Sequence, residues 1–283
     1  MIFSAKDNYL LGIANKVMRI LILYLQITKK TITSSQGGNM TNLFGEFFGT
    51  LVLISFGCGV NANLTLEKSY AKGAGWICTT AGWAFGVMIG AFAAISLGAP
   101  QADLNPAVTL FKTFAGTYTF AQAIPTMFVQ ILGGIAGGTI TWLMYLPHWG
   151  ATDSKEGKLS VFSTGPAINS PMANLLCELL ATAFLLIAFF TIASKAVQGN
   201  PGFGTGLNIY IIAMVIWGIG LSMGGTTGYA INPARDLGPR IAHAILPIAG
   251  KGSSNWGYAW IPIVGPMLGA CLAFLFCRAT NLV

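Results

Sequence analysis

The sequence predicts an all-α membrane protein with six transmembrane helices and two re-entrant half-helices. Hydrophobic residues make up 54% of the 283-residue chain and charged residues only 8%, against about a quarter charged in soluble domains. The tripeptide Asn-Pro-Ala occurs twice, at 105–107 and 232–234, and a glutamate precedes each copy, Glu46 in the first half and Glu178 in the second. Repeated units in a membrane chain indicate a pseudo-symmetric fold with the working site between the halves.

Six apolar stretches are long enough to cross a hydrocarbon core of ~30 Å, which takes roughly 17 to 25 helical residues. They are expected at about 43–62, 73–96, 121–146, 172–195, 205–224 and 257–279. The glycine-rich run 133–138 in the third stretch has the small-residue spacing that lets helices approach closely in lipid. Three stretches precede and three follow a charged loop, so we predict two repeats, about 43–146 and 172–279, joined by 147–171.

Residues 1–39 differ from the rest of the chain and are expected to be an N-terminal extension of a single domain, 40–283. The apolar stretch 9–27 is interrupted by polar residues, which suits an interfacial helix better than a membrane span. The run 36–40 can be encoded by a purine-rich ribosome-binding sequence just ahead of an ATG codon. We therefore hypothesise that Met40 is the natural start and that the extension is a translated leader. A peptide from within it, found by mass spectrometry of natively expressed protein, would contradict this hypothesis.

Charge and cysteine content argue against several other classes. The net charge is +7, but the basic residues are scattered and form no stripe with interleaved aromatic residues, so we expect no nucleic-acid partner. The five cysteines lie in or beside apolar stretches, without Cys-x-x-Cys spacing and without a histidine nearby. This pattern predicts neither a metal site nor a disulfide framework. We expect no cofactor.

Each Asn-Pro-Ala copy precedes a short helix-compatible segment, 107–116 or 234–246. Proline in a first helical turn loses no hydrogen bond, because its missing N–H would be unpaired there. Irregular backbone at membrane depth is tolerated only where it lines a cavity or is buried in protein. We therefore predict two half-helices that begin at Pro106 and Pro233 and meet at the membrane centre.

The meeting of two half-helices would direct two positive helix ends at one point. Asn105 and Asn232 would each cap a half-helix and offer a side-chain NH₂ to the cavity. A cation or a hopping proton would meet positive potential and hydrogen-bond donors there, whereas a neutral hydroxyl compound can accept the hydrogen bonds. The pattern therefore favours a path for small neutral solutes.

Glu46 and Glu178 have two interpretations. Carboxylates inside a membrane are often functional, as in proton-coupled transporters. Their repeated position instead fits structural acceptors for backbone N–H groups of the half-helix segments, because such groups must be satisfied internally in lipid. We favour the structural interpretation.

The two Asn-Pro-Ala motifs, the paired glutamates and the six spans together resemble the major intrinsic protein family, which comprises the aquaporins and the glycerol facilitators. The resemblance covers Leu43 to about Arg278. It implies an aquaporin-like inverted repeat, a right-handed bundle in the cell membrane with one pore per protomer, assembled as a homotetramer. The motif residues expected at the pore centre are Asn105, Pro106, Ala107, Asn232, Pro233 and Ala234.

The segment 232–239 resembles the glycerol-facilitator version of the second motif, in which an aspartate follows the arginine. By this resemblance, Arg235 lines the narrowest constriction on the outer side, where a guanidinium donates to substrate hydroxyls and repels cations. Asp236 is expected to hold neighbouring backbone or loop donors.

The rest of the constriction maps by local motif to Trp83, Gly220 and Tyr229. Histidine in place of Gly220 would narrow the pore to water, whereas glycine is expected to leave room for a carbon chain along the two aromatic rings. An aromatic wall opposite a hydrogen-bonding wall suits a molecule with CH groups on one side and OH groups on the other. We expect a passive channel for glycerol, with water and urea as further permeants.

Departures from the family pattern keep alternatives open. Tyr229 stands where glycerol facilitators commonly have phenylalanine, and Asp103 stands where many members have histidine. The stretch 83–105 is also about two residues longer than usual. The segment 238–247 resembles lactobacillar facilitators, some of which pass lactic acid. A lactic acid channel or a water channel of the same family is therefore the alternative.

An enzyme of a different class is the remote alternative. The stretch 220–224 matches the Gly-x-Ser-x-Gly pattern with Ser222 as nucleophile, and His243 would be its base. That pattern needs a strand-to-helix elbow and an oxyanion hole, but here it falls in a glycine-rich helix tail. An intramembrane serine hydrolase would also leave both Asn-Pro-Ala motifs unexplained. We therefore predict that the protein is not an enzyme.

Overall fold

The structure is a computed structural model, and the residues that it describes are 12, 15, 19 and 43–283. Apart from those first three residues, the extension predicted at 1–39 lies outside the described residues, as does the start hypothesised at Met40. Within the described part the chain forms helices and loops, without a β-strand.

Six of these helices are long and apolar enough to cross a membrane. They are α2 (Leu43–Thr65), α3 (Trp76–Ser96), α5 (Phe120–Met144), α8 (Pro171–Ala193), α10 (Thr205–Met223) and α12 (Ile261–Ala279). Each falls on a predicted span, and the fold prediction is confirmed. The second span begins at Trp76 and not at residue 73, because Gly73 and Gly75 have left-handed backbone angles, with φ of 77° and 93°, that do not continue a helix.

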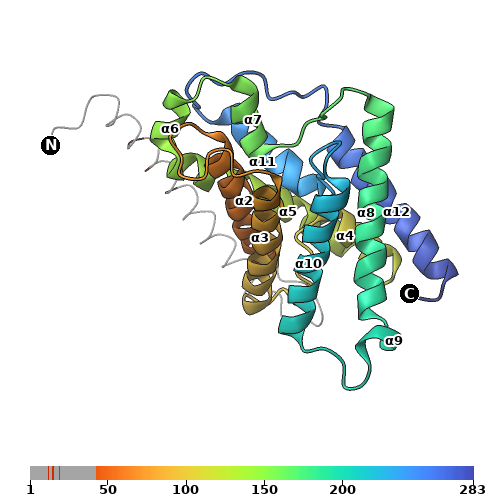
Figure 1. Cartoon of the computed structure of the whole chain (residues 1–283). Helices are drawn as coiled ribbons and strands as arrows, with labels where there is room; N and C mark the ends of the chain where they lie inside the picture. Colours follow the sequence, from red (N-terminus) through yellow and green to blue (C-terminus); the bar gives the residue numbers. More distant parts are fainter. Residues whose placement is uncertain (1–11, 13–14, 16–18, 20–42) are drawn as a thin grey trace.

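Two short helices lie inside the bundle formed by the long ones (Figure 1). They are α4 (Pro106–Phe114), of 9 residues, and α11 (Pro233–Ile245), of 13 residues. At about 1.5 Å per residue each crosses roughly half of a bilayer core. Each short helix packs against a long helix of the opposite half of the chain: α4 contacts α12, and α11 contacts α5. The predicted half-helices are therefore present, and each begins at its proline.

The glycine-rich run of α5 brings two neighbours close to its backbone. A Cβ atom added to Gly133 would lie 2.4 Å from the carbonyl oxygen of Phe47 on α2. One added to Gly134 would lie 2.7 Å from the carbonyl oxygen of Ala234 on α11. Both positions therefore require glycine, and this run sets the distance between the half-helix and the bundle.

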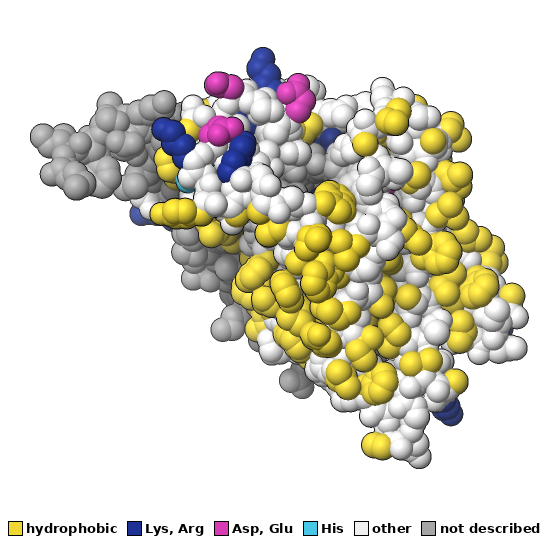
Figure 2. Space-filling model, in the orientation of Figure 1, with side chains coloured by type: hydrophobic (Ala, Val, Ile, Leu, Met, Phe, Trp, Pro, Cys, Tyr) yellow, Lys and Arg dark blue, Asp and Glu magenta, His cyan; other side chains and the backbone are white. Residues whose placement is uncertain are grey.

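The surface of the bundle separates apolar from charged side chains. Apolar side chains cover the flank, whereas most of the charged side chains in view gather at one end (Figure 2). Large exposed apolar residues occur on the spans, including Phe128 on α5, Phe184 on α8 and Leu275 on α12. Such a flank suits contact with lipid, because the backbone groups behind it are satisfied within the helices.

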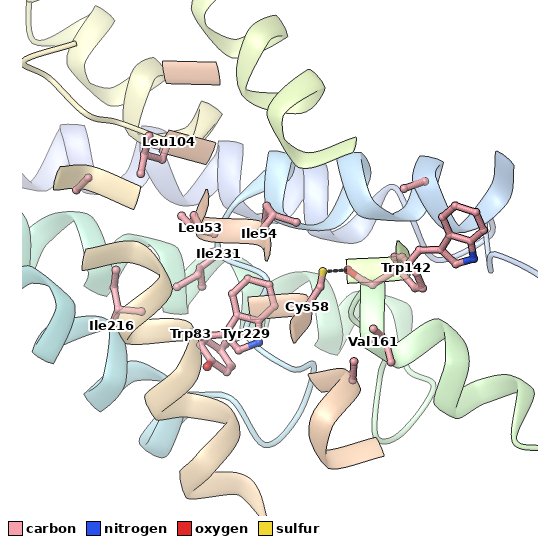
Figure 3. Close-up of a cluster of buried hydrophobic side chains, with 14 of the residues drawn as sticks. Leu53, Ile54, Cys58, Trp83, Leu104, Trp142, Val161, Ile216, Tyr229 and Ile231 are labelled. Atoms are coloured by element: carbon pink, nitrogen blue, oxygen red, sulfur yellow. Dashed lines mark hydrogen bonds between the residues drawn. The ribbon is translucent and has the colours of Figure 1, made fainter. Parts of the chain in front are cut away.

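The linker predicted as a loop at 147–171 has more structure than expected. It contains most of α6 (Leu146–Ala151) and all of α7 (Lys155–Phe162), which lie at one end of the bundle, while α9 (Lys195–Gln198) lies at the other (Figure 1). Val161 and Phe162 are fully buried, and α7 packs against α2 and α11. The dashed line from Cys58 in Figure 3 marks its thiol donating to the Phe162 carbonyl oxygen, at 3.8 Å. The linker therefore forms part of the core.

Candidate functional site

Each motif asparagine joins its own half-helix to the other half of the chain. Its Oδ1 accepts a hydrogen bond from the backbone N–H two residues further on, at 2.9 Å in both motifs. Its Nδ2 donates across the fold, from Asn105 to the Ile231 carbonyl at 2.9 Å and from Asn232 to the Leu104 carbonyl at 2.8 Å. An amide NH₂ carries two hydrogens, so each asparagine keeps one for a further partner. The N-termini of α4 and α11 therefore meet.

The other motif residues lie in the first turns of α4 and α11. Pro106 and Pro233 occupy the first position of their helices, and Ala107 and Ala234 follow them with side chains that are fully buried. These residues position the helix ends and present no polar side chain.

Left-handed residues precede both motifs at matching places. Ala102 and Leu104 have φ of 42° and 53°, and Tyr229 and Ile231 have φ of 39° and 45°. Side chains other than glycine rarely adopt such angles, and each costs on the order of 1–3 kcal/mol unless surrounding structure enforces it. Both stretches therefore need a strong local anchor.

Glu46 and Glu178 supply that anchor and are both fully buried. Each carboxylate accepts two backbone hydrogen bonds from the strained stretch and one from a side chain. The donors to Glu46 are the backbone N–H groups of Asp103 and Leu104 and Gln130 Nε2, at 2.8, 2.9 and 2.9 Å; those to Glu178 are the backbone N–H groups of Ala230 and Ile231 and Thr227 Oγ1, at 2.9, 2.8 and 2.6 Å. This geometry supports the interpretation as structural acceptors.

A cavity of about 330 Å³, here called the Asp103 cavity, reaches both motif asparagines. Asp103, Asn105, Lys112 and Asn232 are among the residues that line it. The Asp103 carboxylate accepts from Lys112 Nζ and, at 2.9 Å, from Thr109 Oγ1. The Asp103 carboxylate is therefore paired with a cation, Lys112, on the half-helix that follows it.

A second cavity of about 220 Å³, here called the Arg235 cavity, is lined by polar and aromatic residues. Arg235, Tyr229, Trp76, Asn61 and Ser163 are among them. Gly220 and Trp83 line neither of these two cavities. The predicted constriction residues therefore divide into two that face the Arg235 cavity and two that stand behind it.

Trp83 holds the guanidinium of Arg235. The Arg235 Cζ atom lies 3.6 Å from the centroid of the Trp83 ring, a distance at which a cation is attracted to the ring face. Trp83 Nε1 donates to Asn61 Oδ1 at 3.1 Å, which fixes the ring. Among the described residues, Arg235 Nη1 has no hydrogen-bond partner. The guanidinium is therefore held in place by the Trp83 ring.

The space beside Gly220 is filled by Tyr229. A Cβ atom added to Gly220 would lie 2.8 Å from Tyr229 Cζ and 2.8 Å from Thr80 Cγ2. The Trp76 ring packs edge-on against Tyr229, with centroids 5.8 Å apart, and its Nε1 donates to the Gly220 carbonyl at 2.9 Å. The Tyr229 ring therefore occupies the space beside Gly220 that was expected to accommodate a passing carbon chain. Figure 3 shows the Tyr229 ring in the same buried cluster as Trp83. The absence of a side chain at Gly220 therefore allows the Tyr229 ring to lie close to α10.

Changing Gly220 to alanine is expected to lower glycerol permeability by about fivefold or more, since inserting a methyl group into a filled site costs about 1–3 kcal/mol and pushes the Tyr229 ring. Water permeability should fall less, because water needs a narrower path. Stopped-flow light scattering on proteoliposomes measures both. Gly218→Ala is the matched control, because a Cβ at Gly218 on the same helix meets nothing within 4 Å. Equal losses of water and glycerol would count against a sizing role.

Asp236 and Arg240 form a fully buried ion pair, with 2.7 Å between Arg240 Nε and Asp236 Oδ1. Asp236 Oδ2 also accepts from the backbone N–H and Oγ1 of Thr164, at 2.8 and 2.6 Å. Arg240 Nη1 donates to the Ser254 carbonyl at 2.8 Å. The pair therefore ties the linker and the loop after α11 to this half-helix. Sequence reasoning missed Arg240, although a second arginine in an apolar segment is costly without a partner.

Ser222 and His243, the two residues of the alternative hydrolase hypothesis, lie in different surroundings. Ser222 is exposed on α10, whereas His243 is fully buried. His243 Nδ1 lies 2.8 Å from Ser254 Oγ. The structure therefore supplies no Ser222–His243 pair for a hydrolase.

Comparisons with known proteins agree with this arrangement. A family model described as "Major intrinsic protein" matches residues 33–276. The glycerol uptake facilitator protein of Bacillus subtilis (strain 168) is 48% identical over 240 residues, which cover 85% of each chain. Glycerol uptake facilitator protein 3 of Lactiplantibacillus plantarum is 48% identical over 233 residues, covering 82% of this chain and 94% of the relative. The X-ray structure of the aquaglyceroporin from Plasmodium falciparum matches with a TM-score of 0.72 and 25% identity, over 85% of this chain and 98% of that one.

Proposed function

The chain belongs to the major intrinsic protein family, and on that premise we propose that solutes pass between the Arg235 cavity and the Asp103 cavity along the meeting point of α4 and α11. The protein is a passive channel for glycerol and small neutral solutes and is not an enzyme. It is a multi-pass protein of the cell membrane.

The reciprocal bonding of Asn105 and Asn232 carries the proposal. Each amide caps its own half-helix and donates to a carbonyl of the opposite half. Two positive helix ends therefore face the path from both sides. The positive potential repels a cation or proton, and the motifs offer it no free acceptor, because each asparagine Oδ1 already accepts a hydrogen bond from its own half-helix. A neutral hydroxyl compound can instead accept hydrogen bonds from the remaining amide hydrogens.

Selection of the solute is assigned to Trp83, Gly220, Tyr229 and Arg235. Arg235 lines the cavity named after it, and Trp83 holds the guanidinium in place. Tyr229 forms the aromatic wall, at a position set by Gly220. Asp236 supports Arg235 indirectly, because it fixes the linker to α11.

Two further features of the assembly are part of the proposal. The domain 40–283 consists of two repeats, about 43–146 and 172–279, because both halves repeat the same glutamate, left-handed stretch and capped half-helix. The channel is a homotetramer in lipid, and the apolar flanks of the spans are the surfaces available for contact with lipid and neighbouring protomers.

Glycerol uptake into proteoliposomes tests the passive mechanism. The flux is expected to rise linearly with the glycerol gradient, since a channel does not undergo a transport cycle for each solute. An imposed proton gradient should leave the flux unchanged, and so should Ser222→Ala. Accumulation of glycerol against its gradient, or saturation at low concentration, would instead indicate a transporter.

A further inference from the structure

Lys112 brings an ammonium group into the wall of the Asp103 cavity. Its side chain lines the cavity and is 18% exposed. Its Nζ donates to the carbonyl oxygen and to Oε1 of Gln101, both at 3.0 Å, and pairs with Asp103 Oδ1. An ammonium has three donors and no acceptor. A set of three oxygen atoms therefore matches the three hydrogens of this ammonium.

The contacts that hold Asp103 do not depend on Lys112. The backbone N–H of Asp103 donates to Glu46 Oε1 at 2.8 Å, and Asp103 Oδ2 accepts from Thr109 Oγ1 at 2.9 Å. Both contacts would survive the loss of the ammonium. The carboxylate is therefore fixed at this point of the cavity wall, whether or not a cation faces it.

The repeated architecture does not require the Asp103–Lys112 pair. In the second half, the backbone N–H that matches that of Asp103 belongs to Ala230, and it donates to Glu178 Oε1 at 2.9 Å. The position that matches Lys112, seven residues after the motif asparagine, is Pro239. The second anchored stretch therefore forms without a carboxylate and without an ammonium at these places. We look for the role of the pair at the Asp103 cavity, which both of its members line.

An Asp103 carboxylate without a counter-ion would make this cavity attractive to cations. Channels build cation sites from carboxylate side chains and backbone carbonyls, and an unpaired charge in surroundings of low dielectric attracts a counter-ion strongly. The positive helix ends act where α4 and α11 meet, so a cation could enter the cavity without passing them. The Lys112 ammonium cannot diffuse away, because its side chain is tethered to α4.

We propose that Lys112 is a specificity-determining residue that keeps cations out of the Asp103 cavity, because its tethered ammonium fills a latent cation site. The site consists of the Gln101 carbonyl oxygen, Gln101 Oε1 and Asp103 Oδ1, and its single negative charge suits a monovalent cation. The inference rests on the proposed function, since the cavity forms one end of the proposed solute path. It explains how a channel for neutral solutes tolerates a carboxylate beside the first motif.

The test replaces Lys112 with alanine and measures glycerol permeability in potassium chloride and in choline chloride of equal concentration. Proteoliposomes of the full chain carry the same salt on both sides. Potassium is close to ammonium in size, whereas choline is too bulky for the site. Wild-type permeability is expected to be equal in both salts. In Lys112→Ala, potassium is expected to lower glycerol permeability about twofold or more, as when at least half of the sites are occupied.

Further variants separate the charge from the loss of a side chain. Lys112→Gln keeps a polar side chain without the charge, and potassium should lower its glycerol permeability in the same direction. The double variant Lys112→Ala with Asp103→Asn lacks both charges and should be as insensitive to potassium as the wild type. Lys195→Ala, which removes an exposed lysine on α9, should be insensitive too.

Two results would overturn the role of Lys112 while the channel itself stands. One is equal glycerol permeability in the two salts for both Lys112→Ala and Lys112→Gln. The other is a fall in potassium that is as large in the double variant as in Lys112→Ala. Wild-type vesicles that pass no more glycerol than empty vesicles would overturn the proposed function together with this inference.

Discussion

Replacing Glu178 with leucine is expected to leave no folded channel in the membrane. The change removes the acceptor of three buried donors, on Thr227, Ala230 and Ile231. Each orphaned group costs about 1–3 kcal/mol, so the sum approaches a typical free energy of unfolding of about 5–15 kcal/mol. The strained stretch before the second motif would lose its anchor as well. The yield of monodisperse protein in detergent and its Tm measure the effect.

Two further variants test whether the effect comes from the lost acceptor of Glu178. Glu178→Gln keeps one acceptor oxygen but brings an NH₂ group toward backbone donors, so its stability should lie between those of wild type and Glu178→Leu. Glu67→Gln is the control, because Glu67 is half exposed and pairs with Lys72 at the surface, where an ion pair contributes about 0–1 kcal/mol. A stable Glu178→Gln channel whose glycerol flux has lost a dependence on the proton gradient would support the transporter interpretation.

Changing Arg235 to methionine is expected to lower glycerol permeability by about tenfold to a hundredfold. A hydrogen bond to a charged group contributes about 1.5–3 kcal/mol, and each 1.4 kcal/mol corresponds to about a factor of ten. Methionine keeps an unbranched side chain, although a shorter one, and removes the charge and the donors. The backbone N–H of Arg235 still reaches Asn232 Oδ1, at 3.2 Å in the wild type, so the half-helix cap should survive. Stopped-flow measurements of glycerol and water give the effect.

Arg235→Lys separates charge from geometry. Lysine keeps the positive charge but lacks the planar fork of five donors, so cation exclusion should persist while glycerol permeability falls to an intermediate value. Cation leakage, followed with a potential-sensitive dye, should rise in Arg235→Met alone. Wild-type glycerol permeability in Arg235→Met would show that the solute path avoids this residue.

The membrane spans and the half-helices could be predicted because their causes are local. Apolar length locates the six spans. Pro106 and Pro233 fix where the half-helices begin, since an asparagine cap and a proline at the first helical position act within a few residues. The roles of Glu46 and Glu178 followed from their repetition, because two equivalent backbone stretches need equivalent acceptors.

Other parts of the site depend on contacts between distant segments. Tyr229 fills the space beside Gly220 only because the loop before α11 folds against α10 and Trp76. Ser163 lines the Arg235 cavity because Thr164 is bound by Asp236, 72 positions further along the chain. Neither of these long-range contacts produces a periodic or compositional pattern in the sequence. The linker at 147–171 is therefore predicted from its charged residues only as a loop, although residues 161–164 within it are buried.

The permeability of wild-type proteoliposomes to water, glycerol and lactic acid at low pH tests the central claim most directly. Stopped-flow light scattering should show glycerol entry well above that of empty vesicles, linear in the gradient and faster than lactic acid entry. Faster lactic acid entry would reassign the preferred solute within the same channel family. Fast water exchange without glycerol entry would contradict the account, because it would mean that the Tyr229 ring closes the path to polyols.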